Sequence, residues 1–169
     1  MINHLDPVIL DMGNKQKLKI DSAAVALMLH FRQMESETPE SGGIMMGRIL
    51  EENSSPMIDE ITVPMEGDIQ SRTRFLRQAE HHQQIFTLKW EENEGRLFYL
   101  GEWHTHPERV PTPSSTDTKN WRKIFLSSNQ SIDYLLFVIV GTECLKVWKV
   151  GKKPREKVKI TLVGKILFK

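Results

Sequence analysis

The chain of 169 residues predicts an α/β fold, with a single mixed β-sheet flanked by helices. Apolar runs of strand length alternate with longer segments of helical character along the sequence. No internal repeat, low-complexity tract or Gly/Ser-rich linker interrupts this alternation. The length suits one domain and leaves little room for a second, so we expect residues 1–169 to form a single domain.

The first half of the chain predicts one helix followed by two paired strands. Asp21 is a suitable N-cap, and residues 22–31 are rich in Ala, Leu and Met, with no Gly or Pro, which favours a helix. Residues 43–50 are an apolar run bounded by glycines and predict a strand. Residues 58–63 follow a turn-forming Asn-Ser-Ser-Pro segment, so we expect them to pair antiparallel with that strand.

The second half continues the alternation of helices and strands. Residues 75–90 carry apolar side chains among polar ones and predict an amphipathic helix, which Gly95 ends. Residues 97–103 predict a strand, and a further helix is expected to begin near Ser114, after a proline-rich loop. Three more strands are predicted by their apolar, β-branched and aromatic content, at residues 133–140, 145–150 and 158–163.

Composition and charge argue against several classes of protein. The formal net charge of +1 gives no reason to expect nucleic-acid binding, and no apolar run approaches the roughly 20 residues that cross a bilayer. The first residues lack the basic start and apolar stretch of a signal peptide. The lone Cys144 excludes an intramolecular disulfide and favours a reducing compartment, and its apolar surroundings predict a buried side chain. We therefore expect a cytoplasmic protein with neither a nucleic-acid nor a membrane partner.

One basic cluster stands near the end of the chain. It has two interpretations, a solvated turn leading into the exposed face of a strand, or a docking patch for an acidic partner. Its members are Lys152, Lys153, Arg155, Lys157 and Lys159.

The residues that carry chemistry lie between the predicted strand at 97–103 and the following helix. His104 and His106 are two apart, so on a strand both imidazoles point to the same face, and Pro107 stops the strand just beyond them. The loop can return Asp117, in the first turn of the next helix, to this pair. Two imidazoles and one carboxylate leave a fourth tetrahedral position for water, as in a catalytic zinc site. Taken separately, the histidines could be ordinary surface or core residues, and Ser114-x-x-Asp117 could be a helix cap.

His104-Thr105-His106-Pro107, the seven-residue gap and Ser114-x-x-Asp117 together resemble the signature of the JAMM (JAB/MPN/Mov34) metalloprotease family. The resemblance implies a JAB/MPN, cytidine-deaminase-like fold with Zn²⁺ held by His104, His106 and Asp117. It also implies that an upstream glutamate is the general base and that Ser114 donates a hydrogen bond to the oxyanion.

The upstream glutamate of the family pattern has more than one match in this chain. Glu40 has the best spacing to the glycines Gly43 and Gly47, and we assign the general base to it. Glu35 and Glu37 stand nearby and remain alternatives. Three further residues are candidates for the site. Glu102 would point to the same side as His104 and could orient an imidazole, whereas the pair His81-His82 is expected in a partly exposed helix.

Trp103, residues 111–117 and Trp121 resemble the short, stand-alone bacterial JAB peptidases found with ubiquitin-like conjugation machinery, including anti-phage CBASS operons. This implies a metallopeptidase that hydrolyses the bond after the C-terminal residue of a conjugated protein, a CD-NTase joined to its target. One alternative is a JAMM peptidase that processes the C-termini of ubiquitin-like or sulfur-carrier proteins. Another is a non-catalytic MPN interaction module. For either peptidase we expect a protein substrate with an extended C-terminal tail, bound beside a sheet edge under a flap at residues 65–73.

Overall fold

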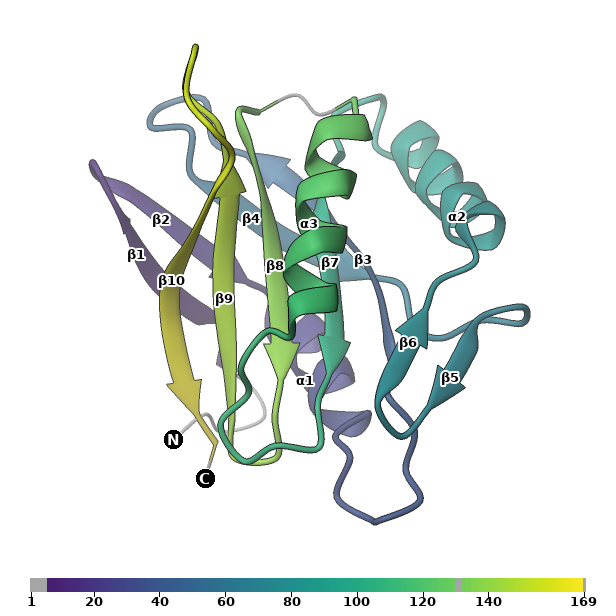
Figure 1. Cartoon of the computed structure of the whole chain (residues 1–169). Coiled ribbons are helices and arrows are strands. Elements are labelled where there is room, and N and C mark those ends of the chain that lie inside the picture. Colours follow the sequence, from purple (N-terminus) through teal and green to yellow (C-terminus); the bar gives the residue numbers. More distant parts are fainter. Residues whose placement is uncertain (1–5, 130–131, 169) are drawn as a thin grey trace.

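The computed structural model describes residues 6–129 and 132–168, which form a large sheet, a separate small hairpin and helices on both faces of the sheet (Figure 1). The strands of the large sheet are β1 (Val8–Gly13), β2 (Gln16–Ile20), β3 (Gly42–Ile49), β4 (Pro56–Ile61), β7 (Phe98–Thr105), β8 (Tyr134–Val140), β9 (Cys144–Gly151) and β10 (Lys159–Leu167). The small hairpin consists of β5 (Ile69–Ser71) and β6 (Arg74–Leu76), and the helices are α1 (Ser22–His30), α2 (Ala79–Glu92) and α3 (Ser115–Ser127).

The large sheet is mixed. Its strands follow the order β1-β2-β4-β3-β7-β8-β9-β10. β2 runs parallel to β4 and β7 runs parallel to β8, whereas the other neighbours are antiparallel. The predicted α/β class with one mixed sheet between helices is therefore confirmed.

Each face of the sheet has its own apolar core. α1 packs Val25 and Met28 against one face, in a cluster that includes Trp103 of β7. α3 covers the other face, where the ring of Trp121 stacks on Phe137 of β8 with 4.9 Å between centroids. α2 lies beside α3 on this second face (Figure 1). β7, which carries His104 and ends just before His106, is thus held from both sides.

The middle of β7 contains a bulge that depends on a glycine. The pairing with β3 shifts between Met45 and Met46, opposite Gly101, which has a φ of 133°. A Cβ at Gly101 would lie 1.7 Å from the carbonyl oxygen of Leu136 on β8, so only glycine fits here. Bulges commonly re-aim side chains next to functional sites, and this one lies three residues before His104.

Most predicted elements are present, and several of their ends differ from the predicted ones. The helix after Asp21 is confirmed, and the Asp21 side chain accepts a hydrogen bond from the amide of Ala23 at 2.9 Å. The helix expected at residues 75–90 begins only at Ala79, because Phe75 belongs to β6 and packs against Gly42 of β3. This contact joins distant parts of the chain and leaves no local periodicity. The last strand is longer than predicted.

Strands β1 and β2 and the β5–β6 hairpin were not predicted as strands. Residues 65–73, expected to form a flap, contribute a loop and β5. Cys144 is buried as predicted. Lys152, Lys153 and Arg155 are exposed after β9, in agreement with a solvated turn. In the part of the chain that the structure describes, no helix is long and apolar enough to cross a membrane.

Candidate metal centre

The two histidines lie at the end of β7, where the parallel pair β7–β8 stops. His104 is on β7, and the amide of His106 extends the pairing by donating to the carbonyl oxygen of Val140 at 2.9 Å. The side chains point to the same side as predicted, and their Nε2 atoms lie 3.0 Å apart. Both imidazoles are mostly shielded from solvent.

Asp117 is brought to this pair by the first turn of α3. It is the third residue of the helix and forms a capping box with Ser114: the Asp117 amide donates to Ser114 Oγ at 3.1 Å, and the Ser114 amide donates to Asp117 Oδ2 at 2.6 Å. Asp117 Oδ1 lies 3.3 Å from His104 Nε2, and Asp117 Oδ2 lies 3.4 Å from His106 Nε2. The helix cap therefore aims the carboxylate at the imidazoles.

These three side chains fit a tetrahedral zinc ion. Ligand atoms placed 2.0–2.1 Å from zinc at tetrahedral angles are separated by about 3.3 Å. The two imidazole nitrogens lie 3.0 Å apart, close to that value. Asp117 places Oδ1 3.3 Å from His104 Nε2 and Oδ2 3.4 Å from His106 Nε2, and one ligand atom from each of the three residues lies within 4.8 Å of the others. The donor set of two imidazole nitrogens and one carboxylate oxygen is also one that zinc accepts. The residues of this cluster thus match the size and the chemistry of the ion.

The Asp117 carboxylate is held in its ionised form, which is the form that binds a cation. Burial alone would raise the pKa of Asp117, but hydrogen bonds from His104 and His106 outweigh it and hold the pKa well below its usual range. Burial alone would lower the pKa of His106, yet its hydrogen bond and proximity to Asp117 raise it. In the absence of a metal, the His106 imidazole and the Asp117 carboxylate thus stabilise one another's charges.

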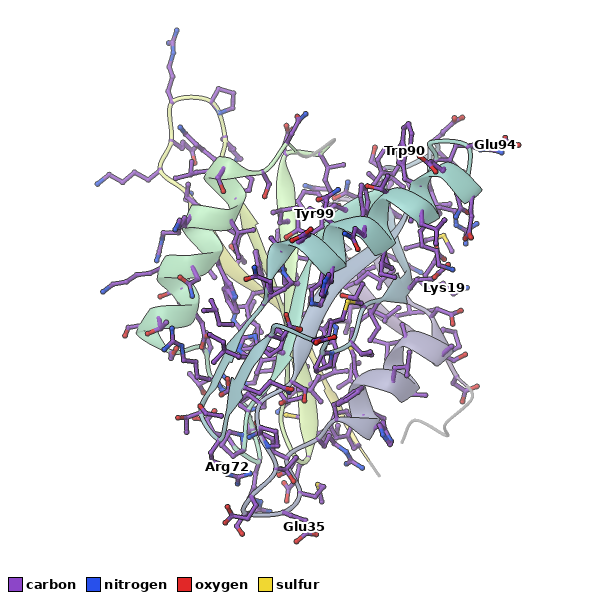
Figure 2. All side chains as sticks on the ribbon, turned by 90° about the vertical axis from the view of Figure 1, so that its right-hand side faces the viewer. Lys19, Glu35, Arg72, Trp90, Glu94 and Tyr99 are labelled. Atoms are coloured by element: carbon purple, nitrogen blue, oxygen red, sulfur yellow. The ribbon has the colours of Figure 1, made fainter. Side chains whose placement is uncertain are left out.

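Glu40 lies beside the cluster, in the loop before β3. Its Oε1 atom is 3.9 Å from His106 Nε2, and only 8% of its side chain is exposed. Burial raises the pKa of Glu40 to about 7, with His106 and a hydrogen bond from the Phe75 amide acting in the opposite direction. Glu35 and Glu37 are both exposed, and Glu35 lies at the tip of the loop, on the outside of the molecule (Figure 2). Of the three glutamates, the fold brings Glu40 to the cluster.

Ser114 is the exposed N-cap residue of α3. The prediction that Ser114-x-x-Asp117 forms a helix cap is therefore confirmed. It is compatible with a catalytic role, because a hydroxyl oxygen can accept a hydrogen bond while its proton is donated elsewhere.

The sequence matches a family model, described as prokaryotic homologues of the JAB domain, over residues 22–151. This range contains Glu40, both histidines, Ser114 and Asp117. The chain belongs to this family.

Curated relatives of this JAB-domain chain carry the name "CD-NTase/cGAS isopeptidase". The chain is 39% identical over 132 residues to one from Vibrio cholerae serotype O1, covering 78% of this chain and 79% of that protein. A second, from Escherichia coli strain TW11681, is 33% identical over 140 residues, covering 83% and 84% of the two chains. The solution structure of a Desulfitobacterium hafniense protein superposes with a TM-score of 0.54 at 19% identity, covering 83% and 87%, and supports the fold.

The JAB-domain site also contains a carboxylate that was not among the residues predicted from the sequence. Glu108 Oε2 lies 3.6 Å from His106 Nδ1 and accepts a hydrogen bond from the Thr112 amide at 2.7 Å. At this distance the carboxylate is a charged neighbour that raises the pKa of His106, after the larger effects of burial, Asp117 and Glu40. The only signal in the sequence was an acidic residue two positions after His106.

Glu102, a candidate for orienting an imidazole, has other partners. It forms an ion pair with Arg77 and accepts a hydrogen bond from Tyr99. Glu102 thus links β7 to the residues just before α2.

His82 is buried, although the sequence predicted that His81 and His82 lie in a partly exposed helix. Its ring is fully buried, with Nδ1 2.6 Å from Thr62 Oγ1 and Nε2 2.9 Å from Asp68 Oδ2. Thr62 Oγ1 also accepts a hydrogen bond from the amide of Ile44 on β3. This buried network joins α2 to the loop after β4.

Proposed function

We propose that this JAB-domain chain is a zinc-dependent isopeptidase. The observation that carries the proposal is the convergence of ligand atoms from His104, His106 and Asp117 within 4.8 Å of one another, with the buried Glu40 carboxylate beside them. A non-catalytic interaction module would have no need of a buried glutamate next to three metal-ligating groups. Membership of the JAB family supports the same activity.

His104, His106 and Asp117 would hold the ion. A zinc ion with three protein ligands supplies a Lewis acid and lowers the pKa of a bound water molecule to about 7. The capping box would keep the Asp117 carboxylate in place.

Glu40 would move the proton. Its carboxylate takes a proton from the attacking water and passes it to the amine that leaves when the amide bond breaks. A carboxyl group whose pKa lies near 7 before metal binding is suited to exchange protons near neutral pH. Ser114 would donate its hydroxyl proton in a hydrogen bond to the oxygen that becomes negative in the transition state.

The names of the relatives support a specific substrate class. We propose that the bond cleaved joins the C-terminal residue of a CD-NTase to an amine of its target, within a bacterial anti-phage system. The substrate would present an extended C-terminal tail to the metal centre. We propose a cytoplasmic setting, in which the lone Cys144 stays reduced.

The test is cleavage of a CD-NTase whose C-terminus is fused through an amide bond to a second protein. The zinc-loaded wild-type chain should release the CD-NTase with its native C-terminal residue, as measured by mass spectrometry. A ubiquitin-like protein fused in the same way serves as the comparison substrate. Failure of the zinc-loaded chain to cut either fusion would exclude the proposed activity. Cleavage of the ubiquitin-like fusion alone would reject the CD-NTase as the substrate.

A further inference from the structure

Gln33 is an uncharged, buried residue that connects β7 to two segments beside Glu40. These segments are the loop before β3 and the β5–β6 hairpin. Gln33 lies after α1 and is only 1% exposed. Burying an amide without partners is costly, so its hydrogen bonds indicate why a glutamine is present.

The amide of Gln33 bonds to three different segments. Its Nε2 donates to the carbonyl oxygen of Thr38 at 3.0 Å and to that of Arg72 at 2.8 Å. Its Oε1 accepts a hydrogen bond from Thr105 Oγ1 at 3.2 Å. Thr38 is in the loop that leads to Glu40, Arg72 is in the β5–β6 turn, and Thr105 stands between the two histidines.

Thr105 carries this connection to the neighbour of Glu40. Its fully buried side chain accepts a hydrogen bond from the Ser41 amide at 2.9 Å, and its own amide donates to the Ser41 carbonyl at 2.8 Å. The backbone next to Glu40 is therefore paired directly with the residue between the metal ligands.

The β5–β6 hairpin holds Glu40 from the other side. The Glu40 amide donates to the carbonyl of Ser71 at 2.8 Å, and Gln70 Nε2 donates to the Glu40 carbonyl at 2.8 Å. The Phe75 amide donates to the Glu40 carboxylate itself. The position of Glu40 thus depends on how the hairpin lies relative to β7, and Gln33 bridges these two.

We propose that Gln33 is a positioning residue that fixes the Glu40 carboxylate relative to His104 and His106. This proposal rests on the proposed function. Only an amide side chain offers two donors to the two carbonyls together with an acceptor for the Thr105 hydroxyl. A glutamate would face those carbonyls with a carboxylate, and an apolar side chain would leave all three groups without their partner.

The expected effect is on the rate of the chemical step. Misplacement of a catalytic group by about 1 Å can cost about 100-fold in rate. In Gln33→Met, which keeps the length of the side chain but none of its hydrogen bonds, kcat should fall about 10- to 100-fold. KM and the zinc stoichiometry should stay at their wild-type values, because neither the substrate surface nor the ligands change.

Two comparisons separate positioning from a loss of stability. Ser55→Ala is the matched control, because Ser55 is also buried and bonds to a backbone amide, that of Lys17 at 3.0 Å, away from the metal centre. It should leave kcat unchanged. Thr105→Val removes the hydroxyl that Gln33 accepts from, so its kcat loss and that of Gln33→Met should be less than additive in the double variant. Additive losses, or a wild-type kcat in Gln33→Met, would overturn the proposal.

Amide hydrogen exchange tests the same point without an activity assay. Protection of the Glu40 and Ser41 amides should fall in Gln33→Met while that of β8 and β9 stays constant. Unchanged protection at Glu40 and Ser41 would overturn the positioning role. An inactive wild-type chain whose Gln33→Met variant still loses this protection would refute the proposed isopeptidase function and leave the positioning of Glu40 intact.

Discussion

Oε1 of Glu40 lies 3.9 Å from Nε2 of His106, although one residue precedes β3 and the other follows β7. The pairing of these two strands creates the relationship, because Gly42 on β3 is opposite His104 on β7. A proton-transfer group and a metal ligand therefore meet through sheet register.

Glu40→Gln should slow cleavage strongly and preserve zinc binding. Loss of a general base typically lowers kcat by about 10²- to 10⁴-fold, whereas the three ligands are untouched. Kinetics on the CD-NTase fusion and metal analysis of the same preparation measure both effects. Glu35→Gln is the matched control, because Glu35 is an exposed glutamate of the same loop. Full activity in Glu40→Gln would transfer the role of base to another residue.

Glu40 should make the metal-free protein less stable as the pH rises. Burial raises its pKa from 4.5 to about 7, so the folded state binds this proton more tightly than the unfolded chain. The stabilisation is complete below about pH 4 and is lost as the pH rises through 7. In the absence of metal, Glu40→Gln should therefore be more stable than the wild type at pH 8, by up to about 3 kcal/mol.

Urea unfolding at pH 5 and pH 8 in the presence of a chelator measures this difference. The advantage of Glu40→Gln over the wild type should be smaller at pH 5. An equal advantage at both pH values would mean that the carboxyl group titrates normally in the folded state.

Zinc should stabilise the folded protein through the three ligands. A ligand that binds only the folded state contributes about 2.7 kcal/mol at 100 times its dissociation constant. Chelation should thus lower the melting temperature and stop cleavage, and added zinc should restore both. Asp117→Asn should lose most of this zinc dependence. A melting temperature of the wild type that zinc does not change would argue against the metal site.

Local patterns in the sequence were sufficient for much of the fold. Asp21 and the residues after it form the predicted helix, and the apolar runs at residues 43–50 and 133–140 form β3 and β8. The β5–β6 hairpin could not be predicted, because its strands have three residues each and are mostly exposed. Phe75 shows the reason: it packs on Gly42, far away in the sequence, and local periodicity does not register such a contact.

The candidate site likewise has residues that could be predicted from the sequence and residues that could not. His104, His106 and Asp117 were predictable because their spacing follows from a strand, a loop and a helix cap. Choosing Glu40 required the family resemblance, since Glu35 and Glu37 have the same chemistry and differ in burial. Gln33 could not be singled out, because its importance depends on three hydrogen bonds to distant segments.

The buried pair Asp68–His82 should stabilise the protein, in contrast to Glu40. Burial alone would raise the pKa of Asp68, but hydrogen bonds from the Met65 and Gln78 amides and from His82 lower it. This stabilisation is present above the normal Asp pKa of about 3.9 and is lost as the pH falls. His82→Ala leaves the carboxylate and the Thr62 hydroxyl short of a partner and should cost about 2–3 kcal/mol at pH 7.

Urea unfolding of His82→Ala, with His81→Ala as control, tests this expectation. His81 makes a hydrogen bond to the Glu66 carbonyl at the surface, so its replacement should have little effect. Equal stabilities of the two variants would show that the buried pair contributes no net stability.

Ser114 combines a helix cap with a proposed catalytic donor, and substitutions can separate the two. Ser114→Ala removes both, so it should lose about 1 kcal/mol of stability and about 10²- to 10³-fold in kcat. Ser114→Asp should recover the stability but not the rate, because Asp is a good cap and an ionised carboxylate has no proton to donate. Ser114→Thr should retain most of both properties. Unfolding curves and kcat of the three variants test this expectation. If kcat followed stability across the series, Ser114 would act only as a helix cap.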